Sequence, residues 1–251
     1  MKITKNITTY IFGLVLMMTT AAVSMEVRAG LSLNADAVYL SGSETLKDSG
    51  KQTQMNEAGL FHYGSIFGEL ATDAGFAIGV EYAPEYADLP RETRIDCSTL
   101  SAYSATKTDR SSGACQSGNS GVANGAVAAV DAKTNTVDAK VSDALTAYVH
   151  VPVGDSGLYG KIGAMFAEIV VNENLGTGSS YGDVDAQAMI IGMGYSGDLS
   201  DNMFWRVEGS YMQFENIKER GSQAGGTATS FNSIAAEMAG AQGKLSVGMA
   251  F

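Results

Sequence analysis

The sequence predicts an all-β protein: an eight-stranded antiparallel up-and-down transmembrane β-barrel with short periplasmic turns and long extracellular loops. Three observations predict this fold. Apolar and polar residues alternate along eight segments, the connections between the segments alternate between long and short, and the apolar faces carry almost no charge. A soluble sandwich or a lipocalin-like barrel would instead expose a face rich in Lys, Glu and Thr.

The composition of the 251 residues excludes several other classes of protein. Charged residues make 17% of the chain, whereas soluble domains average about 25%. Hydrophobic residues make 45% and the mean hydropathy is +0.02, so apolar and polar residues are interleaved. The chain is too apolar to be disordered, and after the N-terminus it has no run of about 18 apolar residues for a spanning helix. A net charge of −11 argues against a nucleic-acid partner.

The N-terminus has the pattern of a secretory signal peptide. Lys2 and Lys5 form a positive region, the apolar stretch 11–18 follows, and small residues come next. Two positions fit the small-x-small cleavage rule, and we expect cleavage after Ser24, with Ala29 as the alternative. The predicted domains are a signal peptide, 1–24, and an outer-membrane barrel, 30–251.

Eight segments of the mature chain alternate with the period of two that is typical of strands. In the first of them Leu31 and Leu33 share the apolar face, and Ser32 and Asn34 lie on the other face. In order along the chain, the predicted strands are 31–39, 60–71, 76–82, 141–153, 158–171, 188–195, 203–211 and 244–251.

The connections between these strands support a membrane barrel independently. Three of them are short: 72–75, 154–157 and 197–202. Four are long and begin near residues 40, 85, 172 and 216. Outer-membrane barrels have short periplasmic turns and longer extracellular loops, so the segment 85–138 is predicted to be the longest extracellular loop. A further hairpin within 117–140 would raise the strand count to ten.

The face opposite the apolar one combines small residues with isolated charges. A narrow lumen explains both features, because small residues leave room and opposite charges can pair inside. A charge on the lipid face would cost about 2–4 kcal/mol near the midplane of the bilayer, and Glu168, on the apolar face, lies close to the loop end of its strand. The predicted lumen charge network is Asp36, Glu69, Glu81, Lys161, Arg206, Glu208 and Lys244.

The last strand ends in an aromatic residue and carries apolar residues at every second position: Leu245, Val247, Met249 and Phe251. This pattern resembles the insertion signal of bacterial outer-membrane barrels. Together with the signal peptide, the strand count and the loop alternation, the mature chain resembles the OmpA/OmpX/Opa-type family of small barrels. The resemblance implies a monomer that is exported through the periplasm to the bacterial outer membrane. It also implies contact with outer-membrane lipid, including lipopolysaccharide, and recognition of the C-terminal strand by the barrel-assembly machinery.

Cys97 and Cys115 both lie in the predicted loop 85–138. An exported protein passes through an oxidising compartment, so a disulfide between them is expected. Closing a loop of this size removes about 3 kcal/mol of unfolded-state entropy. A redox or metal pair would need a nearby His or a closer spacing, and the sequence has neither.

No residue of the chain is predicted to be catalytic, cofactor-binding or metal-ligating. His62 is expected on the lipid face near the extracellular end of its strand, and His150 in the lumen near the periplasmic end, too far apart to act together. The segment 178–182 has the Gly-x-Ser-x-Gly spacing but joins two strands rather than a strand and a helix. Asp183 and Asp185 could touch a cation, but two carboxylates do not form a calcium cage.

These features predict a non-enzymatic barrel with a side-chain-filled lumen, because the interior of eight strands is just wide enough for side chains to fill. Such a protein would serve envelope structure and surface interaction, by adhesion or recognition, through its extracellular loops. A host or phage surface is the expected class of loop ligand. The alternative function is a small porin-like channel for ions or small solutes.

Overall fold

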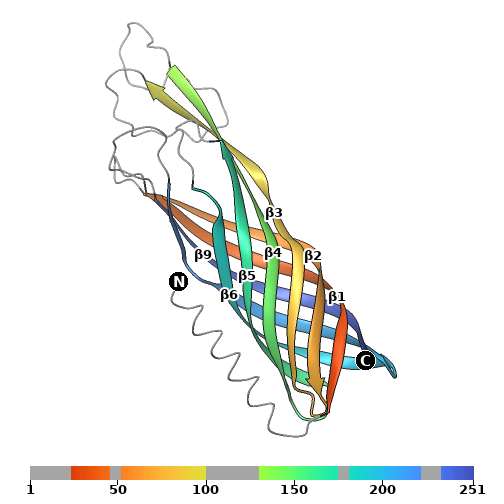
Figure 1. Ribbon diagram of the computed structural model, residues 1–251. Coiled ribbons are helices and arrows are strands. Elements are labelled where there is room, and N and C mark those ends of the chain that lie inside the picture. Colours follow the sequence, from red (N-terminus) through yellow and green to blue (C-terminus); the bar gives the residue numbers. More distant parts are fainter. Residues whose placement is uncertain (1–23, 46–51, 100–129, 175–180, 222–232) are drawn as a thin grey trace.

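The structure, a computed structural model, describes residues 24–45, 52–99, 130–174, 181–221 and 233–251. Within these ranges the chain forms strands that run side by side in an inclined wall (Figure 1). Their bounds are β1 (Met25–Thr45), β2 (Gln52–Thr72), β3 (Ala77–Thr99), β4 (Val130–Pro152), β5 (Leu158–Asn174), β6 (Val184–Ser200), β7 (Met203–Phe214), β8 (Ile217–Arg220) and β9 (Ser233–Ala250). No helix in the described part is long and apolar enough to span a bilayer.

The strands close into a ring of eight. Each strand pairs antiparallel with its neighbours in the order β1 to β7 and then β9, and β9 pairs with β1 from Arg28↔Ala250 to Thr45↔Ser233. The short β8 continues the course of β7 and pairs only with the outer end of β9. Because β1 pairs with β9, the sheet has no terminal strand, and this closure confirms the predicted fold class.

The three short connections lie at one end of the barrel. In the first, the amide of Gly75 donates to the carbonyl of Thr72 at 2.8 Å, and Gly75 has a φ of 84°, which a glycine adopts without strain. Gly157 in the second turn has a φ of 82°. The C-terminus lies at this same end, since the amide of Phe251 donates to the carbonyl of Val27 at 2.9 Å. We refer to it as the turn end.

The prediction of a loop over 85–138 is wrong at both of its limits. β3 continues to Thr99 and β4 starts at Val130, so residues 85–99 and 130–138 are strand. Pro84 and two register shifts, at Glu85/Ala87 and at Leu89/Glu92, interrupt the period of two. The remaining residues of that loop, 100–129, lie outside the described part. In the same way β8 falls in a segment that was expected to be loop.

The structure shows where the barrel begins, but it leaves the signal peptide and the disulfide largely outside the described residues. β1 begins at Met25, five residues before the expected barrel boundary at residue 30. The signal peptide 1–24 lies outside the described residues except for its last position. Cys97 belongs to β3, but Cys115 is not described, so the disulfide stays a prediction.

The outer surface of the barrel is apolar up to a ring of acidic side chains. The exposed outer side chains include Leu31, Leu33, Leu60, Ile66, Leu70, Val80, Leu145, Ile162, Met189, Ile191, Met193 and Val207. Nearer the long loops come exposed carboxylates on β2 to β6, just past β7, and on β9. These are Glu57, Glu85, Asp143, Glu168, Asp185, Glu215 and Glu237, which we call the acidic girdle. Because a charge in hydrocarbon is costly, the girdle marks the upper limit of the apolar band.

Candidate functional site

The lumen is built by the inward positions of all the ring strands. The seven charges predicted to lie there come from β1, β2, β3, β5, β7 and β9. All of them are buried, from Asp36 at 0% exposure to Lys244 at 7%. Because side chains alternate between the two faces of a strand, each charged residue that stands between outward apolar residues is turned inward.

Glu69 is the centre of the ion pairs nearest the turn end. Arg206 donates two hydrogen bonds to its carboxylate, one of them from Nη1 to Oε2 at 2.8 Å. The hydroxyl of Tyr148 donates to the same Oε2 at 3.1 Å, and Nη1 of Arg28 lies 3.9 Å from Oε1. The guanidinium of Arg206 also lies 4.4 Å from the centre of the Phe204 ring. Glu69 thus has several charged and neutral donors, as a buried carboxylate needs.

A second group of four charges lies deeper in the barrel. Nζ of Lys161 is 2.7 Å from Glu208 and 4.0 Å from Glu81. Lys244 bonds to Glu81, and its Nζ lies 3.7 Å from Glu208. Each lysine therefore lies between two carboxylates. With Glu69 and Arg206, these two groups hold three buried carboxylates and three buried cations, and Asp36 is a fourth buried carboxylate outside them.

Neutral side chains satisfy further oxygens of this network. The hydroxyl of Tyr159 donates to Glu208 at 2.8 Å, and Ser65 donates to Glu81 at 2.5 Å. Ser65 in turn accepts a bond from the amide nitrogen of Asn34 at 2.8 Å. The polar layer therefore extends through hydrogen bonds from β7 to β1.

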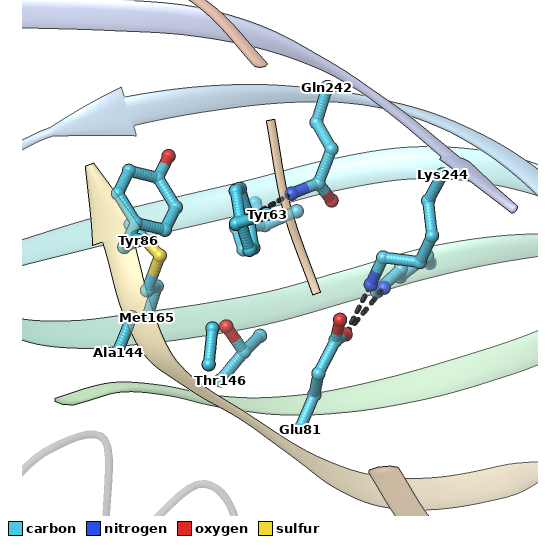
Figure 2. A pocket seen from close by; sticks show the side chains of 11 residues that line it. Tyr63, Glu81, Tyr86, Ala144, Thr146, Met165, Gln242 and Lys244 are labelled. Carbon is cyan, nitrogen blue, oxygen red and sulfur yellow. Dashed lines mark hydrogen bonds and ion pairs between the residues drawn. The ribbon is translucent and has the colours of Figure 1, made fainter. Parts of the chain in front are cut away.

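Asp36 does not join the ion pairs, although the sequence analysis grouped it with them. Its carboxylate accepts bonds from the hydroxyls of Tyr86 at 2.5 Å and Tyr63 at 3.1 Å, and from the amide of Gln242 at 3.4 Å. A cavity of about 10 Å³ separates this group from Glu81 and Lys244, which point toward one another in Figure 2. Such a volume holds about one water molecule.

An apolar plug that the alternation pattern did not predict lies between the charges and the long loops. Its buried members are Ala83, Tyr86, Ala87, Ala144, Met165, Ala167, Ala188, Ile190, Met212 and Phe214, and Phe61, Tyr63, Val141 and Met238 pack against them. One feature of the sequence does indicate this plug. Met189, Ile190 and Ile191 are apolar in succession, so both faces of β6 are apolar there. The lumen is thus polar in one half and apolar in the other.

The two histidines are separated as the sequence analysis expected, but one has a carboxylate beside it. His62 is exposed on the outer face of β2. His150 is 2% exposed, stacks between Tyr148 and Tyr159, and has its Nε2 3.5 Å from Glu208. This pair lies inside the filled lumen rather than at a rim where a substrate could reach it.

The remaining candidates from the sequence are the segment 178–182 and the two carboxylates that follow it, Asp183 and Asp185. Part of 178–182 lies outside them. The carboxylate of Asp183 accepts a hydrogen bond from the amide of Val171 at 3.0 Å, and Asp185 belongs to the acidic girdle. Across the described ranges, His, Cys, Asp and Glu form no group of three that could hold a metal ion. The residues of the C-terminal signal, Leu245, Val247, Met249 and Phe251, are 45–75% exposed on the outside of the barrel.

Gly79 on β3 makes room for the ring of Tyr148. A Cβ at Gly79 would overlap this ring, which is buried and bonded to Glu69. We expect Gly79→Ala to lower the free energy of unfolding by about 1–3 kcal/mol, measured by urea unfolding in lipid vesicles. Gly68→Ala is the matched control, because a Cβ there would meet only the carbonyl of Arg28 at 4.0 Å. Equal effects of the two variants would contradict this packing.

No protein-family model and no curated protein matches the chain. Among solved structures, the outer membrane protease OmpT from Escherichia coli shares 10% identity and a TM-score of 0.44, over 93% of this chain and 99% of that one. Ail, the attachment invasion locus protein of Yersinia pestis, shares 11% and a TM-score of 0.30, over 87% and 99%. Neisserial surface protein A shares 11% and a TM-score of 0.28, over 85% and 97%. By its own strand pairing, the chain is a small eight-stranded up-and-down β-barrel of the kind found in outer membranes.

Proposed function

We propose that the protein is a closed, non-enzymatic barrel of the bacterial outer membrane that serves envelope structure and surface interaction through its extracellular end. The observation that carries this proposal is the filled lumen. The lumen contains, in order along the barrel, three ion pairs, the Asp36 group and the apolar plug. The cavity between the ion pairs and the Asp36 group has a volume of about 10 Å³. A conducting pore would need a continuous aqueous path instead.

The outer surface supports the membrane part of the proposal. Leu31, Leu33 and Met193 are each at least 67% exposed, and such a wide apolar surface is unusual on a soluble monomer. Hydrocarbon would cover it, and the acidic girdle would then lie at the level of lipopolysaccharide headgroups. The outward apolar residues of β9, together with Phe251 just after it, would be read by the barrel-assembly machinery after export through the periplasm.

The surface-interaction part of the proposal rests on the segments beyond the girdle. β3 and β4 continue as a hairpin past the rim of the barrel wall (Figure 1). Segments that project from a rigid scaffold are where binding residues concentrate. A host or phage surface molecule is the class of ligand that such a projection would meet, and the closed ring lets a monomer present it.

The test is single-channel recording of the purified, refolded protein in planar bilayers. We expect no stable openings, because ions would have to cross both the charge network and the apolar plug. The control is a variant in which Met212 and Phe214 of the plug are both replaced by Gly, which shows whether the assay detects a widened lumen. Stable openings of reproducible size in the unaltered protein would overturn the proposal in favour of a small porin-like channel.

A further inference from the structure

Among the described ring strands, the pairing of β2 with β3 is the shortest and leaves a seam between them. These strands pair only from Ile66↔Tyr82 to Ala71↔Ala77. β2 nevertheless pairs with β1 as far as Gln52, and β3 pairs with β4 as far as Thr99. Beyond Ile66, no strand in the described part of the chain pairs with the other side of β2, and we call residues 52–65 on this side the open edge. In Figure 1 the outer part of β3 leaves the wall together with β4.

The sequence explains why β3 does not close this seam. Pro84 follows the last paired residue, Tyr82, by two positions, and it has no N–H to continue a ladder. The register shifts at Glu85/Ala87 and Leu89/Glu92 bend the strand further. β2 has no such feature, since residues 52–65 contain no Pro and their register with β1 is unbroken. The open edge is therefore straight and regular.

The main-chain groups that face the open edge can be identified. At the turn end, the amide of Thr72 donates to Phe76 at 2.8 Å and its carbonyl accepts from Gly75, so both groups of Thr72 face the side of β3. In a regular antiparallel strand, the main-chain groups of alternate residues face the same neighbour. The N–H and C=O groups that face the open edge are thus those of the even-numbered residues Gln54, Asn56, Ala58, Leu60, His62 and Gly64.

The outer part of this edge is accessible from outside the membrane. Residues 54–58 are exposed on both faces of the strand, which places them beyond the apolar band and beyond the plug. A row of alternating N–H and C=O groups at strand spacing is complementary to an extended polypeptide, which adds as a further strand. Natural edges are often protected by charged side chains, Pro or a bulge. Residues 52–65 contain no Pro, their register with β1 has no bulge, and Glu57 is their single charged residue.

The charge around the seam indicates the chemistry of the added strand. Glu57 lies on β2 and Glu85 on β3, and both belong to the acidic girdle. Lys140 pairs with Glu85 at 3.1 Å, whereas Glu57 makes no ion pair with any residue in the described part of the chain. We propose that the open edge of β2 binds an extended, basic segment of a partner polypeptide by strand addition. This inference rests on the proposed role in surface interaction and names the kind of partner.

Amide hydrogen exchange on the refolded full chain, measured residue by residue by NMR, tests the inference directly. In the free protein the amides of Gln54, Asn56 and Ala58 are expected to exchange fast, and those of Met55 and Glu57, which face β1, slowly. A synthetic peptide of alternating Thr and Lys should slow the three even-numbered amides by about tenfold or more and leave the odd-numbered ones unchanged. Slow exchange at the even positions without peptide would overturn the inference, because another part of the chain or a second copy would already occupy the edge.

Peptide affinity, measured by fluorescence anisotropy, gives a second readout. Ala58→Pro removes one N–H from the open edge and leaves the ladder with β1 intact, so it should weaken binding by about tenfold. Ala58→Thr keeps the N–H and should stay within about twofold of the original affinity. The same peptide with alternate amides N-methylated keeps its charge and should not bind. Equal affinities for both variants, or binding of the methylated peptide, would overturn strand addition. Bilayer recording tests the proposed function separately. If the protein does not conduct and also does not bind the peptide, only the inference of strand addition is overturned.

Discussion

Replacing Arg206 by Ala is expected to lower the free energy of unfolding by about 3–5 kcal/mol, because the change leaves a buried charge without its main partner. The side chain of Glu69 is fully buried, and without Arg206 it keeps the Tyr148 hydroxyl at 3.1 Å and the more distant guanidinium of Arg28 at 3.9 Å. The variant also loses the contact between the guanidinium and the Phe204 ring. Urea unfolding in lipid vesicles measures the effect, with the chain's single tryptophan, Trp205, as the fluorescent reporter.

Two controls separate burial from charge loss. Lys140→Ala removes an exposed cation that pairs with Glu85 at 3.1 Å and should change stability by less than about 1 kcal/mol. The double variant Arg206→Met, Glu69→Leu removes both members of the buried pair and should recover a large part of the loss. If Arg206→Ala is as mild as Lys140→Ala, the lumen is hydrated and the filled-barrel account is wrong.

Replacing Ile162 by Arg is expected to cost about 2–4 kcal/mol of stability, because its side chain faces hydrocarbon near the middle of the bilayer. Ile162 is 55% exposed on the outside of β5 and lies between Val149 of β4 and Ile191 of β6. In water, the same substitution at an exposed position would change stability by less than about 0.5 kcal/mol. The measurement is the same urea titration in lipid vesicles.

Glu168→Arg is the matched control for Ile162→Arg. Glu168 lies on the same strand and the same outer face, but in the acidic girdle. A charge near the interface costs only about 0–1 kcal/mol. Equal losses for the two variants would mean that the outer face of β5 does not meet a graded membrane, and the apolar band would need another explanation.

The period of two was sufficient to predict the ring of strands and the inward direction of the charges. Alternation identifies a strand only where its two faces meet different surroundings, and this condition holds between the turn end and the girdle. Beyond the girdle both faces of β3 and β4 are outside the apolar band, so residues 85–99 and 130–138 gave no alternation and were predicted to be loop. The limits of the predicted strands therefore follow the limits of the apolar band, and the backbone pairing continues beyond them.

The partners within the lumen could not be predicted from the sequence. Which charges meet depends on the stagger between strands, which fixes the height of each residue along the barrel. Asp36 is a charged inward residue like the others, but its level is shared by Tyr63, Tyr86 and Gln242 and not by a cation. The apolar plug was missed for a related reason, because an inward apolar residue such as Ile190 does not break the pattern of a membrane strand. The seam is visible only once the pairing of β2 with β3 is known.

The pairs in the lumen join parts of the chain that are far apart in the sequence. Glu69 and Arg206 are separated by 137 residues, and Glu81 and Lys244 by 163. While β7 and β9 are not yet in place, Glu69 and Glu81 lack their closest cations, Arg206 and Lys244, and keep only the more distant Arg28 and Lys161. Contacts between residues far apart in the sequence form late in folding, because the chain must first lose the entropy of closing a long loop. They therefore stabilise the complete barrel more than its intermediates. We therefore expect assembly of this barrel to be cooperative, because the last strand both closes the ring on β1 and brings Lys244 beside Glu81.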